Sequence, residues 1–219
     1  MADMTTRRVT LTFDNGPTPG VTEHVLDILA RRRILATFFV IGRKLGEPAA
    51  AALMQQAHMA GHWIGNHTLS HTVALGDRPE RDYAVSEIEG AQRRIGRFSH
   101  PDKLFRPYGN SGRLGPHLLS RAALEHLVAQ DYRTVIWNNV PGDWKDPDGW
   151  VESCMAQVSI QDWSVVVLHD IEGGCITRLP ELLQRLEGLG VMFEQDFPDA
   201  VTLTRAGRIV SLPQCYVTD

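Results

Sequence analysis

The sequence contains few cysteines, and none of them form a close pair. Cys154, Cys175 and Cys215 are odd in number and do not have the CxxC spacing of a zinc or redox motif. This pattern excludes a disulfide framework and predicts reduced thiols in a reducing compartment.

Long hydrophobic runs are also absent. No stretch is long enough to cross a membrane, and the start, MADMTTRRVTLTFD, passes from a short polar leader into a strand without the apolar segment of a signal peptide. We therefore expect a cytoplasmic protein with no membrane partner.

The chain has no excess of positive charge. Its 22 Lys and Arg residues face 26 Asp and Glu, for a net charge of -4, and Arg31, Arg32 and Arg33 form only a short local cluster. A broad basic surface for nucleic-acid phosphates is excluded, so we expect no nucleic-acid partner.

Linkers, low-complexity tracts and internal repeats are missing as well, so residues 1–219 are predicted to form a single domain.

Strand-like and helix-like patterns alternate along the whole chain. The expected strands are VTLTF, ATFFVIG, HWIGNH, LFRP, TVIWN and SVVVLHD, followed by the short GVMFEQ and AVTLT. The expected helices cover residues 21–33, 47–61, 79–98, 117–130, 149–160 and 176–190. In the third helix, Ala84, Ile88, Ala91 and Ile95 share one face, which should pack on a sheet. About seven βα units follow, which form either an open parallel sheet or a barrel.

Polar side chains gather where the expected strands end. They are Asp14 and Asn15, His67 and His71, Arg106, Asp143 and Trp144, and His169 and Asp170. Because the carboxyl ends of parallel strands meet on one face of an α/β fold, these side chains are expected to line a single pocket.

His67 and His71 are candidate metal ligands. They lie four residues apart, a spacing that on a helical turn points both imidazoles the same way. A surface or helix-capping pair is the alternative, and Asn66 and Thr68 are interpreted as caps of a following helix.

His169 is a candidate general acid or base, because it follows the apolar run VVVL and emerges at a strand end. Asp143 is its expected carboxylate partner. The alternative is a histidine satisfied within the core.

Arg106 is expected to orient Asp14, while a backbone N–H of the Pro-Tyr-Gly turn at Tyr108 faces an oxyanion. A purely structural salt bridge is the alternative. Among the tryptophans around NNVPGDWKDPDGW, Trp144 is the candidate for stacking on a sugar, and Trp137 and Trp150 are assigned to the core.

The ordered set TFDNGP, GNHTLSH, FRPYG, GDW and VVVLHD resembles the five successive motifs of the polysaccharide deacetylases, carbohydrate esterase family 4 or the NodB-homology domain. The resemblance covers residues 10–170. It implies a distorted (β/α)7 barrel and metal-assisted hydrolysis of an N-acetyl or related acyl group.

The resemblance also implies catalytic roles. Asp14 resembles the catalytic base, Arg106 the arginine that tethers it, and His169 the general acid whose pKa is tuned by the region of Asp143 and Trp144. In the implied mechanism, Asp14 removes a proton from water and His169 protonates the departing amine.

By the same resemblance, His67 and His71 match two metal ligands of the family. The third is usually an aspartate, where this chain has Asn15, as in the muramic lactam deacetylases. A neutral amide should weaken binding of the divalent ion, which we expect to be zinc, with cobalt, nickel or manganese as alternatives. FRPYG also lacks the family's double proline, which bears on the oxyanion donor at Tyr108.

Three functions follow as hypotheses. The first is a deacetylase of an N-acetylated sugar or short oligosaccharide. The second is an amidohydrolase of a small amide or cyclic imide or ureide on the same fold, with weak or no metal dependence. The third is a non-catalytic carbohydrate-binding relative with a decayed site.

Overall fold

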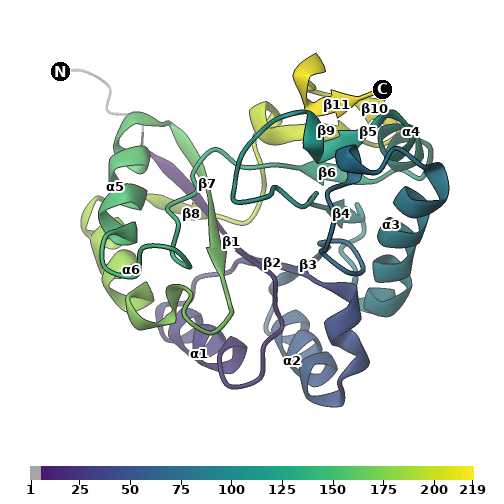
Figure 1. Cartoon of the computed structure of the whole chain (residues 1–219). Helices are drawn as coiled ribbons and strands as arrows, with labels where there is room; N and C mark the ends of the chain where they lie inside the picture. Colours follow the sequence, from purple (N-terminus) through teal and green to yellow (C-terminus); the bar gives the residue numbers. More distant parts are fainter. Residues whose placement is uncertain (1–5) are drawn as a thin grey trace.

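The computed structural model describes residues 6–219 and shows a curled sheet with helices on its outside (Figure 1). The parallel strands are β1 (Arg8–Asp14), β2 (Thr37–Val40), β3 (Trp63–Asn66), β4 (Leu104–Phe105), β6 (Arg133–Val135) and β7 (Trp163–His169). The helices are α1 (Thr22–Arg32), α2 (Pro48–Met59), α3 (Arg81–Ile95), α4 (Arg121–Ala129), α5 (Trp150–Ile160) and α6 (Leu179–Gly188).

The sheet closes into an irregular barrel. Its strand order is β10-β9-β6-β4-β3-β2-β1-β7, where β9 is Thr202–Arg205 and β10 is Arg208–Ile209. An isolated parallel bridge between Asn139 and Val166 joins the chain after β6 to β7. The bridge brings the chain that follows β6 back beside β7, so the six parallel strands form a ring, as in a barrel. The predicted distorted (β/α)7 barrel is thereby confirmed.

The C-terminal strands depart from the expected parallel series. β8 (Met192–Glu194) pairs parallel with β1, but β9 (Thr202–Arg205) runs antiparallel to β6 and to β10 (Arg208–Ile209). A separate pair joins β5 (Leu119–Ser120) to β11 (Val217–Thr218). No strand was expected at β5, β10 or β11. Leu119 and Ser120 of β5 fell inside the helix expected over residues 117–130, which begins only at Arg121.

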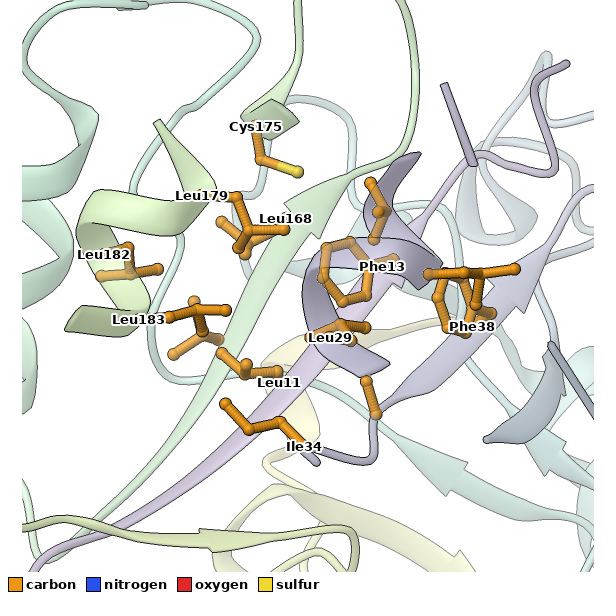
Figure 2. Packing of buried hydrophobic residues seen from close by; sticks show 14 of the residues in the cluster. Leu11, Phe13, Leu29, Ile34, Phe38, Leu168, Cys175, Leu179, Leu182 and Leu183 are labelled. Atoms are coloured by element: carbon orange, nitrogen blue, oxygen red, sulfur yellow. The ribbon is translucent and has the colours of Figure 1, made fainter. Parts of the chain in front are cut away.

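Alternation along β1 and β7 divides the apolar core from the barrel interior. Leu11 and Phe13 of β1 and Leu168 of β7 pack against α1 and α6 (Figure 2). Successive side chains of a strand point to opposite faces, so Thr12 and Asp14 face inward. The buried Thr12 hydroxyl donates to the carbonyl oxygen of Val166. The two strands therefore bring polar groups to the inside of the barrel and satisfy them there.

The third helix is amphipathic as expected: Ala84, Ile88, Ala91 and Ile95 are all buried. Glu87 of α3 is also buried, and it accepts a hydrogen bond from the Ser70 amide. Within the described part of the chain, no helix is both long and apolar enough to cross a membrane.

Candidate active site

A pocket of about 200 Å³ opens where the parallel strands end. Its lining includes Asp14, Asn15, His67, His71, Tyr108, Trp144 and His169. The register of β1 and β7 places Asp14 directly beside His169. Residues that are far apart in the sequence thus share one cavity, as the strand-end pattern predicted. Arg106, Asp143 and Asp170, which were also expected to line it, are instead fully buried and lie outside the lining.

Asp14 is buried and held by Arg106. The Arg106 Nη1 donates to Asp14 Oδ1 at 2.8 Å and to the Thr12 hydroxyl at 2.6 Å, and the guanidinium is fully buried. Burial alone would raise the pKa of Asp14, but the charge and hydrogen bond of Arg106, together with His67 and His169, outweigh it and hold the pKa below its usual range. The Asp14 carboxyl is therefore anionic near neutral pH.

His67 presents one ring nitrogen to the pocket. Its Nδ1 lies 2.8 Å from the carbonyl oxygen of Arg106, and because a carbonyl only accepts, Nδ1 carries the hydrogen. Nε2 then keeps its lone pair and lies 3.6 Å from Asp14 Oδ2. Burial lowers the pKa of His67, and the nearby Asp14 offsets this only in part. The ring is neutral and suited to ligate a cation.

The segment from His67 to His71 is a loop, so the prediction of a helical turn was wrong. Thr68 and His71 have positive φ angles of 67° and 54°, which a right-handed helix excludes. The Asn66 side chain accepts from the Thr68 amide, and the Thr68 hydroxyl accepts from the His71 amide. Asn66 and Thr68 therefore build this turn rather than cap a helix.

The turn still brings the two imidazoles together. The ring centroids of His67 and His71 are 4.6 Å apart, and the His71 ring lies 4.1 Å from that of Tyr108. Burial, with repulsion from His67, lowers the pKa of His71 to about 3. Both imidazoles are thus neutral near neutral pH.

Asn15 completes a set of donors that fits a divalent cation. Its Oδ1 is buried without a hydrogen-bond partner, and the residue adopts a left-handed φ of 75°. Among residues 6–219, no group of three or more His, Cys, Asp or Glu side chains is arranged to hold a metal. The Asn15 oxygen and the two neutral imidazoles of His67 and His71 all line the pocket, and these donor types suit an ion such as zinc.

His169 forms a close pair with Asp143. The Asp143 Oδ1 lies 2.8 Å from His169 Nδ1, and its Oδ2 accepts from the His169 amide, also at 2.8 Å. Burial alone would lower the pKa of His169, but the hydrogen bond and the charge of Asp143 outweigh it and raise the pKa. The Trp144 ring meets the imidazole edge-on at 4.4 Å. The pair therefore favours the protonated form of His169 beside the pocket.

One wall of the pocket was missed by the sequence analysis. Trp137, which had been assigned only to the core, lines the pocket together with residues 109–112. Its Nε1 donates to the carbonyl oxygen of Gly112 at 3.0 Å. The glycines of GNSG, which directly follow FRPY, were the available signal for a close approach of backbone to an aromatic ring. Trp150, by contrast, is in the core as expected.

Tyr108 contributes its ring to the pocket. Within residues 6–219, its amide donates no hydrogen bond to another backbone or side-chain group. An amide of this kind at a pocket wall is able to act as an oxyanion donor, the role that the sequence analysis gave to this turn.

The barrel and its strand-end pocket, with an anionic carboxylate beside a histidine of raised pKa, have the architecture of a general acid–base hydrolase. The family model described as polysaccharide deacetylase matches residues 2–125. The chain belongs to the polysaccharide deacetylase family.

Two curated relatives cover most of the chain. A peptidoglycan-N-acetylglucosamine deacetylase of Bacillus cereus is 30% identical over 194 residues, which are 84% of each protein. A chitooligosaccharide deacetylase of Sinorhizobium fredii is 36% identical over 173 residues, or 76% of this chain and 72% of the relative.

A solved structure supports the same assignment. The family 4 acetyl xylan esterase from Clostridium thermocellum, in complex with a cobalt ion, is 27% identical and superposes with a TM-score of 0.68. The match covers 86% of this chain and 88% of the esterase.

Proposed function

We propose that this protein hydrolyses the N-acetyl group of a small carbohydrate, such as an N-acetylglucosamine oligosaccharide. The observation that carries the proposal is the placement of Asp14 and His169 side by side on β1 and β7, each with its own charged partner. Arg106 holds Asp14 as an anion, and Asp143 holds a proton on His169. Two neighbouring groups whose pKa values are pushed in opposite directions suit a base and an acid of one reaction.

Asn15, His67 and His71 would hold a divalent ion, which we propose to be zinc, with cobalt, nickel or manganese as alternatives. Such an ion supplies Lewis acidity, which lowers the pKa of water and polarises an acyl oxygen. The cobalt complex of the acetyl xylan esterase supports a divalent ion in this fold.

The protein's own residues perform the proton transfers. Asp14 accepts a proton from the attacking water as its oxygen bonds to the acyl carbon. The Tyr108 amide donates to the developing oxyanion, and His169 gives its proton to the amine nitrogen as the carbon–nitrogen bond breaks. An amine is too basic to leave as an anion, so hydrolysis needs this acid.

Aromatic rings support a sugar as the substrate. Trp144 and Tyr108 line the pocket, and Trp137 forms part of its wall. Such rings present flat apolar faces against which the C–H face of a pyranose packs. The relatives that are named as deacetylases of chitooligosaccharide and of peptidoglycan N-acetylglucosamine support the same class of substrate.

Acetate release from chitooligosaccharides tests the proposal, with hydantoins and cyclic imides assayed beside them for ring opening. We expect zinc-dependent acetate release that is abolished in Asp14→Ala. Activity confined to the hydantoins and imides would overturn the deacetylase proposal.

A second candidate is the amidohydrolase of small cyclic amides, and Asn15 is the observation that favours it. A neutral amide in place of a carboxylate lowers the affinity for a metal ion, and a reaction with weak or no metal dependence tolerates that loss.

A decayed, non-catalytic site fits less well, because buried Asp14–Arg106 and Asp143–His169 pairs serve no purpose in sugar binding alone. The cytoplasmic location stays a prediction.

A further inference from the structure

A second buried carboxyl lies directly behind the site. Asp170 follows His169 at the end of β7, is fully buried, and is not among the residues that line the pocket. The mechanism proposed above gives it no role. One of its oxygens, Oδ1, has no hydrogen-bond partner. Burying a polar atom without a partner destabilises the folded protein, so the presence of Asp170 here calls for an explanation.

The other oxygen of Asp170 holds the start of α1. The Thr22 hydroxyl donates to Asp170 Oδ2 at 2.6 Å and accepts from the Thr18 amide at 2.7 Å. The Thr18 hydroxyl in turn accepts from Lys44 Nζ at 2.8 Å. A chain of hydrogen bonds thus runs from the end of β7 through the loop of residues 15–21, which joins β1 to α1.

The carboxyl of Asp170 also lies against the backbone of this loop. A Cβ built on Gly16 would lie 2.0 Å from Oδ2 and 2.3 Å from Oδ1 of Asp170, so only glycine allows the loop to pass this close. Asn15, the preceding residue, has a left-handed φ of 75°, which is unfavourable for a residue with a side chain. A strained conformation persists where its surroundings fix it.

We propose that Asp170 is a positioning residue that fixes residues 15–21, and through them the amide of Asn15 and the carboxylate of Asp14. It wedges between Gly16 and Thr22 and ties the strand that ends in His169 to the loop that follows Asp14. This inference rests on the proposed function of the site as a metal-dependent hydrolase. It predicts that metal affinity depends on a carboxyl that does not contact the metal.

Four variants test the inference: Asp170→Ala removes the wedge, Asp170→Asn keeps its shape and an acceptor for Thr22, Thr22→Val removes the hydroxyl, and Thr22→Ser retains it. The measurements are hydrogen–deuterium exchange of residues 14–22 in metal-free protein, the dissociation constant for zinc, and kcat and KM at saturating zinc. Thr204→Val is the matched control, because Thr204 is a buried threonine whose hydroxyl bonds the Tyr132 carbonyl outside the site.

We expect Asp170→Ala and Thr22→Val to speed exchange in residues 14–22 and to weaken zinc binding by about tenfold or more. At saturating zinc, kcat should fall by about tenfold while KM changes less than about twofold, because the base is misplaced and the sugar contacts remain. Asp170→Asn and Thr22→Ser should retain most of the zinc affinity and of kcat. Thr204→Val should match the wild type in all three measurements.

Wild-type exchange and zinc affinity in both Asp170→Ala and Thr22→Val would overturn the inference. So would an Asp170→Asn protein as impaired as Asp170→Ala, because charge rather than shape and hydrogen bonding would then matter. If Asp170→Ala does not fold, Thr22→Val and Asp170→Asn decide between these results. If the wild type releases no acetate but the exchange and zinc data behave as expected, the proposed function fails and the role of Asp170 stands.

Discussion

At the scale of single residues, the site depends on two buried charge pairs. Arg106 holds Asp14 as an anion, and Asp143 favours the protonated form of His169. Each pair is fixed by hydrogen bonds of 2.8 Å in a region that water reaches poorly. The base and the acid therefore hold their working protonation states at the same pH.

Asp143→Asn tests how the acid is tuned. The raised pKa of His169 means that the protonated acid is lost only as pH rises through that value, so the rate should decline on the alkaline side. An asparagine removes the negative charge and keeps one of two acceptors, which lowers the pKa of His169. We expect the alkaline decline of kcat to move to lower pH, and kcat at neutral pH to fall by about tenfold or more.

The pH dependence of kcat in Asp143→Asn is compared with that in Asp148→Asn, which changes an exposed aspartate of the same loop. Asp148→Asn should keep the wild-type profile. An unmoved alkaline limb in Asp143→Asn would show that Asp143 does not set the protonation of His169.

Asn15→Asp tests the third metal ligand. A carboxylate adds a negative charge where Asn15 now offers a neutral oxygen, so the dissociation constant for zinc should fall by about tenfold. Isothermal titration of metal-free protein measures the change. An unchanged constant would mean that Asn15 does not contact the metal, and would favour the amidohydrolase alternative.

Sequence reasoning reached those residues whose chemistry is visible as a pattern. Asp14 and His169 are titratable groups at the ends of apolar runs, and Asp143 lies in the loop that follows β6. The βα rhythm alone predicts that such groups converge. Trp137 gave no comparable signal, because an apolar ring at a strand end is typical of a core. Asp170 stood in the quoted motif, but its contact with Gly16 depends on how the loop folds back.

At the scale of elements, loops diverge most from the sequence-based expectation. The spacing of His67 and His71 suits a helix, yet the segment forms a turn built on Asn66 and Thr68. Positive φ angles depend on local hydrogen bonds that hydrophobic periodicity does not report. The imidazoles of His67 and His71 are adjacent, as predicted, although a turn rather than a helix brings them together.

The wall formed by residues 109–112 is a second such loop. Asn110, Ser111 and Gly112 all have positive φ angles, and the Arg113 amide donates back to the Gly109 carbonyl, which closes a left-handed turn beside the pocket. Trp137 contacts this turn, donating from its Nε1 to the Gly112 carbonyl oxygen.

Gly109→Ala tests this wall. A Cβ at residue 109 would lie 2.2 Å from the Trp137 ring, which is too rigid to yield without moving the loop. We expect kcat/KM for the acetylated sugar to fall by about tenfold or more. Gly188→Ala is the control, since a Cβ there meets nothing within 4 Å and should leave kcat/KM unchanged. A wild-type kcat/KM in Gly109→Ala would show that the wall formed by residues 109–112 does not contribute to substrate binding.

At the scale of the whole molecule, alternation of strands and helices was enough to predict the α/β class. Closure of the barrel was not visible from periodicity, because it depends on a single bridge between Asn139 and Val166 in a segment without regular strand pairing. The antiparallel β9 was likewise hidden, since strand direction leaves no mark on a run as short as AVTLT. The ordered motifs, rather than the periodicity, pointed to the barrel.

The central claim is that one carboxylate removes a proton beside a metal held by other residues. Zinc content and acetate release, measured together on wild type, Asp14→Ala and His67→Ala, test it most directly. The account predicts that Asp14→Ala retains zinc but loses about 10²- to 10⁴-fold in kcat, whereas His67→Ala loses both zinc and turnover. Unchanged zinc content in His67→Ala, or wild-type turnover in Asp14→Ala, would contradict it.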